Sequence, residues 1–275
     1  MPNSSVPAVS DVGDFYDKAG QFLQTLSGDN THVGYWEDDS DLSSFPEAQD
    51  KLTDLLGAKL DLHPGQRLLD VGCGLGRPAL RLAEHLDVDV TGIAVSPWQI
   101  GQATRGAEQH GGAGQATFQL ADAMSLPFDD DSFDAALALE VLIHVPDVPL
   151  ALREISRVLR PGGRLVMSDI TGAKPMTAGQ RKIFTSVMPF NWPVPSLQEY
   201  CSTLRAAGFE VVESIDVTDH VRRSYLEIPQ GITARRDELV VACGQEVFDR
   251  LDQGIRSLTE TIRECTGYLV LTCTA

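Results

Sequence analysis

One stretch, RLLDVGCGLGRPALRL at positions 67–82, constrains the fold of this chain more than any other. An apolar run with a single acid, Asp70, is followed by glycines at alternate positions, Gly72, Gly74 and Gly76, and then by an amphipathic helical pattern. The stretch predicts a strand, a tight turn and a helix, because glycine tolerates positive φ angles and the close approach of a ligand. The free N–H groups at the start of such a helix favour a nucleotide-like ligand with an anionic or carboxylate end.

The spacing of these glycines bears on which ligand the turn holds. A dinucleotide-binding turn reads G-x-G-x-x-G, and its acid follows about twenty residues later. Here the pattern is G-x-G-x-G and the acid comes before it. The spacing therefore disfavours a NAD site, although by itself it leaves a NAD site and a plain tight turn open.

Short apolar runs alternate with helical patterns through the middle of the chain. After the first strand, we expect strands over 88–95, 116–120, 133–139 and 164–170. Such alternation is typical of βαβ units, so we expect an α/β fold with a mostly parallel sheet. The carboxyl ends of parallel strands meet at one edge, where ligands bind. The residues expected to converge there are 70–76, 94–96, Asp122, 140–144 and Asp169.

The flanking segments predict the organisation around this core. Residues 1–10 are expected to be disordered, and a helical pattern begins at Asp11. We expect N-terminal helices and a lid over 1–60, a Rossmann-like core over 61–170 and a lid segment over 171–200. The C-terminal strands are expected over 201–275, with a helical cap inserted at about 220–264.

Composition excludes several classes of protein. The 275 residues carry a formal net charge of −17, which argues against binding to nucleic acid or to anionic membrane surfaces. The N-terminus lacks the pattern of a signal peptide, and no apolar run is long enough to span a membrane, so we expect a cytoplasmic protein. Five dispersed cysteines and six scattered histidines predict reduced thiols and no metal site.

Five segments together resemble the class I S-adenosylmethionine (SAM) methyltransferases, over essentially the whole chain from about Asp11. They read HVGYW, LLDVGCGLGRPALRLA, VTGIAVSPWQI, ADAMSLPFDDDSFDAALALEVLIHVPD and ALREISRVLRPGGRLVMSDI. Within this class the chain is most similar to small-molecule enzymes of bacterial natural-product pathways, of the rebeccamycin sugar O-methyltransferase type. The resemblance implies a Rossmann-like fold with a seven-stranded, mostly parallel sheet, helical cap and lid insertions, and SAM as the cofactor.

The resemblance also implies a set of cofactor-binding residues. Gly72, Cys73 and Gly74 would line the methionine part, with Asp70 ordering the turn. The remaining implied contacts are Asp122, Ala123 and Met124 at the adenine, Leu139 and Glu140 near the sulfonium, and Trp36 closing over the methionine end. For Trp36 the alternative is a loop anchored in the core. Many class I enzymes end the second strand with an acid that binds the ribose, and this chain does not. We therefore expect Ser96 and Gln99 to take that role.

The candidate catalytic pair is His144 and Asp169. His144 follows the fourth strand, and an unperturbed histidine pKa suits a general base near neutral pH. Asp169 ends the fifth strand, next to it in the sheet, and would fix the imidazole tautomer. The alternative is that His144 is a capping or packing residue and that Asp169 begins the lid. The sugar enzymes have two adjacent histidines where this chain has Ile143 and His144.

That departure points away from a sugar and towards a less polar acceptor. Apolar residues of the first helix and the lid would contact it, or alternatively would only pack in the core of the protein: Tyr16, Phe184, Met188, Phe190 and Trp192. We therefore expect methyl transfer from SAM to a hydroxyl of a small, largely apolar natural product. C- or N-methylation of an indole, terpenoid or similar scaffold remains open, as does a non-catalytic SAM-binding protein. The expected partner is a small-molecule acceptor, without nucleic acid or membrane, and the oligomeric state is undecided.

Overall fold

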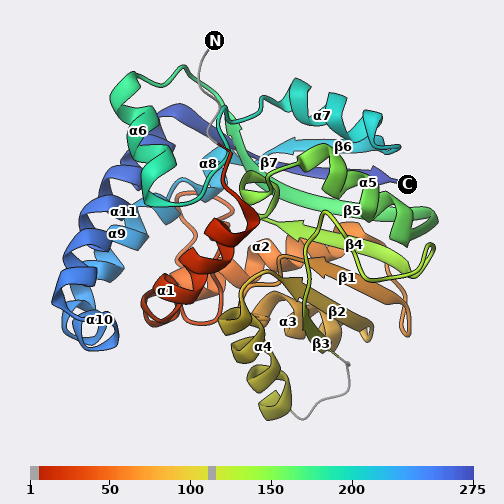
Figure 1. Ribbon diagram of the computed structural model, residues 1–275, viewed down its shortest axis with the longest axis horizontal. Helices are drawn as coiled ribbons and strands as arrows, with labels where there is room; N and C mark the ends of the chain where they lie inside the picture. Colours follow the sequence, from red (N-terminus) through yellow and green to blue (C-terminus); the bar gives the residue numbers. More distant parts are fainter. Residues whose placement is uncertain (1–5, 111–115) are drawn as a thin grey trace.

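The computed structural model describes residues 6–110 and 116–275. Its centre is a seven-stranded sheet in the order β3-β2-β1-β4-β5-β7-β6 (Figure 1). The strands are β1 (Arg67–Val71), β2 (Asp89–Ala94), β3 (Ala116–Leu120), β4 (Phe133–Leu139), β5 (Leu159–Gly172), β6 (Glu210–Asp216) and β7 (Thr266–Thr274). Only β7 runs antiparallel to its neighbours among these strands. The predicted α/β class and the mostly parallel, Rossmann-like sheet are thus confirmed.

Helices connect these strands and extend beyond one end of the sheet. They are α1 (Val9–Ser27), α2 (Phe45–Leu60), α3 (Arg77–Leu86), α4 (Pro97–His110), the 3-10 turn η1 (Leu142–His144), α5 (Val148–Val158), α6 (Ala178–Val187), α7 (Leu197–Ala206), α8 (Thr218–Val221), α9 (Ser224–Ala234), α10 (Arg236–Cys243) and α11 (Gln245–Cys265). Within the described ranges, no helix combines the length and the apolar character needed to cross a membrane.

The two faces of the sheet are covered by different helices because successive strand residues point to opposite sides. In β1, Leu68 packs in the cluster that includes Leu56 of α2, whereas Leu69 packs in the cluster that includes Leu152 of α5. Both leucines of β1 are fully buried. A strand buried on both faces reads as a continuous apolar run, which is why the sequence located these strands well.

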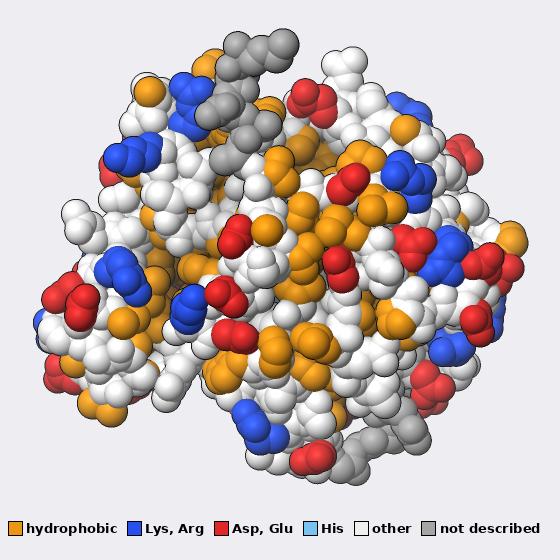
Figure 2. Space-filling view, viewed as in Figure 1, with side chains coloured by type: hydrophobic (Ala, Val, Ile, Leu, Met, Phe, Trp, Pro, Cys, Tyr) orange, Lys and Arg blue, Asp and Glu red, His pale blue; other side chains and the backbone are white. Residues whose placement is uncertain are grey.

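A separate group of helices forms a cap beside the carboxyl edge of the sheet. Side chains of α1, α9, α10 and α11 meet in one apolar cluster, which consists of Phe22, Ile232, Leu239, Phe248 and Ile255. In Figure 1 these helices lie together to one side of the sheet, with α6 beside α11. In the space-filling view from the same direction (Figure 2), apolar side chains gather in the hollow between these helices and the middle of the molecule.

Two predicted boundaries were wrong. Val9 and Ser10 belong to α1, although residues 1–10 were expected to be disordered; positions 1–5 lie outside the described residues. The strand expected over 164–170 runs from Leu159 to Gly172. Both extensions have tertiary causes. At the start, Leu159 pairs with Phe133 of β4, and at the end, Thr171 and Gly172 pair with β7, which lies far away in the sequence.

Helix α1 lies close to the end of β2 because two of its contact positions are glycines. A Cβ atom on Gly13 would stand 2.9 Å from the carbonyl oxygen of Val95, and Gly20 faces the ring of Trp98. Asp17, between them, accepts hydrogen bonds from the Ser96 hydroxyl and from the N–H of Trp98. Close backbone approach thus fixes the position of α1 over the site described below.

We expect Gly13→Ala to destabilise the protein by about 1–3 kcal/mol, because the added methyl group meets backbone that cannot move aside. The matched control is Gly101→Ala in α4, where the nearest atom to a new Cβ is 3.9 Å away. That change should stabilise the protein by about 0.5–1 kcal/mol through helix propensity. Urea unfolding of both variants provides the measurement, and a neutral Gly13→Ala would show that α1 is not held by this contact.

Candidate active site

The glycine turn after β1 has the geometry that its sequence predicts. Gly72, Gly74 and Gly76 have φ angles of 72°, 53° and 85°, in the region that favours glycine. A Cβ atom on Gly72 would lie 2.5 Å from a methyl group of Val141, so no larger residue fits there. The N–H of Cys73 donates to the carbonyl oxygen of Ile93, which ties the turn to β2.

A buried acid stands next to this turn without a compensating charge. Asp70 is 2% exposed, and its Oδ2 atom has no hydrogen-bond partner among the described residues. Burial raises the pKa of Asp70 to about 7. An unpaired buried carboxylate is costly, so its presence at a ligand-binding turn indicates a ligand that carries donor groups or positive charge. The ammonium and sulfonium of SAM, the cofactor that the resemblance implies, fit this requirement.

One cavity runs along the carboxyl edge of the sheet and collects most of the predicted cofactor residues. Its wall includes Asp70, Gly72, Cys73, Gly74, Gln99, Asp122, Ala123, Leu139 and Glu140. They come from the ends of β1 and β4, the start of α4 and the segment after β3. The convergence at one edge that parallel strands predict is therefore present. The roles of the individual residues towards SAM stay predictions.

Three of the implied cofactor residues lie behind the wall of the cavity. The first is Ser96, whose side chain is fully buried. Its hydroxyl donates to Asp17 at 2.5 Å and accepts from the N–H of Gln99 at 3.1 Å. Ser96 thus caps the start of α4, and the expectation that it binds the ribose is wrong. The second is Met124, which packs against the core, while its N–H holds the Oδ1 atom of Asp122 at 2.9 Å.

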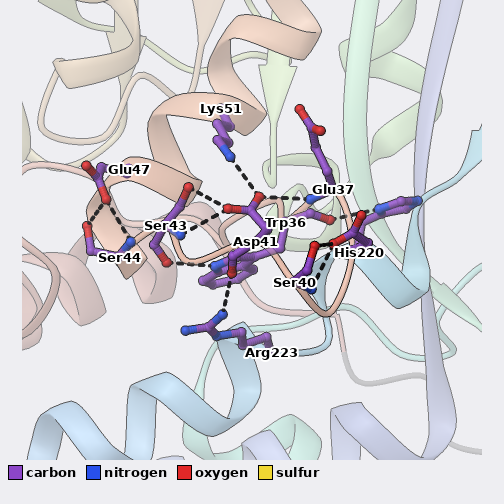
Figure 3. Close-up of polar contacts among 11 residues, drawn as sticks. Trp36, Glu37, Ser40, Asp41, Ser43, Ser44, Glu47, Lys51, His220 and Arg223 are labelled. Atoms are coloured by element: carbon purple, nitrogen blue, oxygen red, sulfur yellow. Dashed lines mark hydrogen bonds and ion pairs between the residues drawn. The ribbon is translucent and has the colours of Figure 1, made fainter.

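The third is Trp36, which anchors a loop instead of closing over the cofactor. Its indole N–H donates to the carbonyl oxygen of Ser43, and its ring stacks on Phe45. Its backbone exchanges hydrogen bonds with His220, as Figure 3 shows, and the guanidinium of Arg223 lies 5.0 Å from its ring. The core-anchor alternative is the correct one. Thr31, Val33 and Phe45 from the same part of the chain line the cavity instead.

Glu140 holds this anchored segment against the sheet. Its Oε1 atom accepts the N–H of Val33 at 2.9 Å and the hydroxyl of Tyr268 at 2.7 Å. Its φ angle is 57°, a left-handed conformation that is rare outside glycine. Such local strain persists only where the surroundings enforce it, and it is frequent at functional sites. Sequence reasoning placed Glu140 at the site but missed Tyr268, which joins it from the opposite end of the chain.

His144 faces the cavity with a defined tautomer. Its Nδ1 atom lies 2.9 Å from the carbonyl oxygen of Pro189, which can only accept, so Nδ1 carries the hydrogen. The lone pair of Nε2 then accepts from the hydroxyl of Tyr16 at 3.2 Å. Burial lowers the pKa of His144 to about 4, so the imidazole is neutral at pH 7. Nε2 is therefore unprotonated and can accept a hydrogen bond from a ligand, but the lowered pKa makes His144 a weaker base than the unperturbed imidazole expected from the sequence.

The predicted pairing of His144 with Asp169 is wrong. The two carboxylate oxygens of Asp169 accept the N–H groups of Ile143 and Ile170, at 2.9 and 2.8 Å. Burial raises the pKa of Asp169 to about 8, even though these hydrogen bonds act in the opposite direction. Asp169 thus orients the turn that carries His144. The carbonyl oxygen of Pro189, and not the carboxylate of Asp169, fixes the imidazole tautomer.

Some of the candidate acceptor residues line the cavity, and others are packed behind it. Tyr16 and Met188 line the cavity, whereas Phe184 is fully buried in the core and Trp192 packs behind it. Phe190 of the lid, also predicted, lines the cavity too, whereas the prediction missed a wall made by the cap, which consists of Tyr225, Ile228, Ile255, Leu258 and Ile262. The apolar face of α11 is visible in the sequence at helical spacing, but spacing alone does not tell a packing face from a cavity wall.

Within residues 6–110 and 116–275, no group of three or more His, Cys, Asp or Glu side chains is arranged to hold a metal ion. The five cysteines are free thiols in the described structure, and Cys73, Cys265 and Cys273 are buried.

The buried carboxyl of Asp70 predicts a pH-dependent stability in the cofactor-free protein. Its folded pKa of about 7 lies above the 3.8 of an aspartate in water, so the folded state binds more protons than the unfolded chain and the free energy of unfolding falls as the pH rises towards 7. Relative to Asp70→Asn, the wild type should lose about 1–3 kcal/mol between pH 5 and pH 8. Urea unfolding across this range measures the difference. The curve of unfolding free energy against pH for Asp129→Asn, in an exposed loop, should run parallel to that of the wild type. If the curve for Asp70→Asn also runs parallel, the pH dependence does not come from Asp70.

Comparison with known proteins adds independent observations. Residues 69–167 match a family model described as a methyltransferase domain. The chain is 36% identical over 272 residues to the 27-O-demethylrifamycin SV methyltransferase of Amycolatopsis mediterranei, which covers 97% of both chains. It is 33% identical over 271 residues to the (+)-O-methylkolavelool synthase of Herpetosiphon aurantiacus, which covers 98% of this chain and 95% of the other.

Solved structures agree with these matches. The [4+2]-cyclase SpnF superimposes with a TM-score of 0.85 at 33% identity, covering 98% of this chain and 97% of the other. The mycolic acid cyclopropane synthase CmaA1, solved with S-adenosylhomocysteine (SAH), gives a TM-score of 0.87 at 22% identity, covering 98% and 99%. The second likeness concerns the fold alone.

Proposed function

Because the chain belongs to the SAM-dependent methyltransferases, and its relatives act in secondary metabolism, we propose that it methylates a hydroxyl group of a largely apolar natural product. The observation that carries the proposal is the neutral Nε2 atom of His144, which faces the cavity beside an apolar wall. Several relatives are named O-methyltransferases, which supports oxygen as the nucleophile. C- or N-methylation of a similar scaffold is the runner-up.

His144 acts as the general base in this proposal. When bound, SAM supplies a methyl group on a sulfonium and leaves as a neutral thioether. At the acceptor, the O–H bond breaks as the new C–O bond forms, and the proton moves to Nε2 of His144. The carbonyl of Pro189 keeps Nδ1 protonated throughout and so holds Nε2 towards the acceptor. The resulting imidazolium returns its proton to solvent after product release.

Tyr16 marks the position that the acceptor hydroxyl takes. Its own hydroxyl donates to Nε2 at 3.2 Å, which is the contact a substrate O–H has to make. Burial, together with the nearby carboxylates of Glu140 and Asp169, raises the pKa of Tyr16, so the phenol stays protonated. The acceptor therefore displaces a neutral hydroxyl, and the phenol ring then covers it from α1.

We expect His144→Asn to lower kcat by about 10²–10⁴, because the side-chain amide can still donate to Pro189 but offers no basic nitrogen. SAH affinity, measured by calorimetry, should stay near the wild-type value. The matched control is His220→Asn, which removes an imidazole with a similar Nδ1 contact to a carbonyl, that of Trp36, behind the cavity wall. If SAH affinity falls as much as kcat, His144 belongs to the cofactor site and the base assignment is wrong.

The Tyr16→Phe variant tests whether Tyr16 only covers the acceptor or also takes part in proton transfer. If the acceptor displaces the Tyr16 hydroxyl, this variant should keep kcat within about threefold of the wild type, with the change confined to KM. A loss of kcat as large as that of His144→Asn would instead place Tyr16 in the path of the proton. Both variants are assayed by mass spectrometry on a panel of hydroxylated polyketides, terpenoid alcohols and glycosides; the glycosides test the sugar acceptor implied by the rebeccamycin resemblance.

A cyclase without methyl transfer is the second candidate, because a relative of solved structure, 33% identical and covering 98% of this chain, is named a [4+2]-cyclase. Ring closure of that kind moves no proton to a base. The His144→Asn variant therefore distinguishes the two candidates: it should lower the rate of methyl transfer strongly, but it should leave a cyclisation rate nearly unchanged.

A further inference from the structure

Among the described residues, the wall of the cavity contains acidic side chains but no strongly basic one. Across residues 6–110 and 116–275, its wall contains five acids and no Lys or Arg. The five acids are Asp29, Asp70, Asp122, Glu140 and Asp169. The absence of cations is not simply the net charge of the chain, which still contains 22 lysines and arginines.

The two histidines in the wall do not supply positive charge either. His32 and His144 are both buried, and burial lowers the pKa of each to about 4. Nδ1 of His32 contacts a backbone carbonyl oxygen, as Nδ1 of His144 does, so each is held as a neutral tautomer. At neutral pH the wall therefore offers no group that could pair with an anion.

Nearby cations are engaged outside the cavity. Arg222 adjoins the segment that carries Tyr225, but its guanidinium binds Asp219 and the carbonyl oxygen of Arg263. Arg77 follows the glycine turn and is paired with Asp50 at 2.8 Å. Both guanidinium groups thus lie outside the wall. Burial raises the pKa of Tyr225, and Arg222 acts on the cavity only at a distance, by partly offsetting that rise.

Two of the five acids, Glu140 and Asp169, lie near the place where the acceptor is proposed to react. Glu140 and Asp169 are both close enough to act electrostatically on the hydroxyl groups of Tyr16 and Tyr225, which face the cavity. The rest of this part of the wall is apolar, with Ile228, Ile255 and Leu258 from the cap. An anion placed here would lose its water and gain no cationic partner among the described residues of the wall.

We infer that the acceptor carries no phosphate, diphosphate or carboxylate on the part that enters the cavity. This inference rests on the proposed function, because it concerns the molecule that receives the methyl group. It also gives the enzyme a place in a reaction sequence. An acceptor built from a prenyl diphosphate reaches this enzyme after a lyase or phosphatase step has removed the diphosphate. A carboxylic acid precursor arrives after esterification, lactonisation or amide formation.

Binding of three matched probes tests the inference without requiring methyl transfer. Farnesol, farnesylamine and farnesyl monophosphate share one apolar body and differ in charge. On the SAH-loaded full chain at pH 7.5, calorimetry should show farnesol and farnesylamine binding at least about tenfold more tightly than the monophosphate. A monophosphate that binds as tightly as farnesol, or more tightly, overturns the inference.

A charge introduced into the wall gives the reciprocal test. Thr259 of α11 lines the cavity and is 5% exposed. Thr259→Lys should strengthen monophosphate binding by at least about tenfold, whereas Thr259→Met, a neutral change of similar length, should not. Failure of the lysine variant to improve phosphate binding counts against the inference. SAH affinity and unfolding temperature report whether the variant folds, and Ile255→Lys, about one turn earlier, takes its place if it does not.

The two proposals fail in different ways. If farnesol binds and the monophosphate does not, but no hydroxylated acceptor gains a methyl group, hydroxyl methylation is wrong while the charge selection stands. If methyl transfer occurs equally to phosphorylated and unphosphorylated alcohols, the selection is wrong and the methylation stands.

Discussion

The hydrogen bonds that converge on the Glu140 carboxylate join three distant parts of the chain. They bring Val33, which follows α1, and Tyr268, in the last strand, to the end of β4. Ser168 of β5 adds a contact to the Tyr268 hydroxyl. Because a buried carboxylate needs such donors, the acid fixes the segment at 31–36 over the glycine turn. The part of the cavity wall that this segment forms depends on this arrangement.

The same segment connects the cofactor region to the cap. Gly34 exchanges hydrogen bonds with the fully buried hydroxyl of Ser224, which begins α9. The next residue, Tyr225, lines the acceptor part of the cavity. Arg223 donates to the carbonyl oxygen of Asp41 and lies over Trp36 (Figure 3). Trp36 therefore contributes by holding the cap to the core.

The chemistry of the site follows from exclusion of water more than from ion pairing. His144 is neutral because it is buried, and its orientation comes from a backbone carbonyl, which adds no charge. The acids keep raised pKa values because no cation compensates them. A positively charged methyl donor suits such a cavity, and a neutral hydroxyl suits the base. The apolar cap then selects the body of the acceptor.

The sequence by itself determined the strands, their parallel arrangement and the edge at which ligands bind. Strands β3 and β4 have the predicted bounds, and the glycine turn has the predicted positive φ angles. These features depend on local rules: apolar runs form buried strands, and only glycine readily adopts those angles. The residues at the strand ends, among them Asp70, Asp122 and Glu140, could be placed for the same reason.

Only the tertiary structure decided which side chains face the ligand and which hold the fold. Ser96 donates a hydrogen bond to Asp17, and the backbone of Trp36 accepts one from His220 beside the cap. His144 contacts the carbonyl oxygen of Pro189 and not Asp169. Each partner lies on another element, so its distance along the chain carries no signal of the contact. The part of the cavity wall on α9 and α11 that is proposed to contact the acceptor could not be predicted from the sequence for a related reason. An apolar helix face has the same spacing whether it meets another helix or an open cavity.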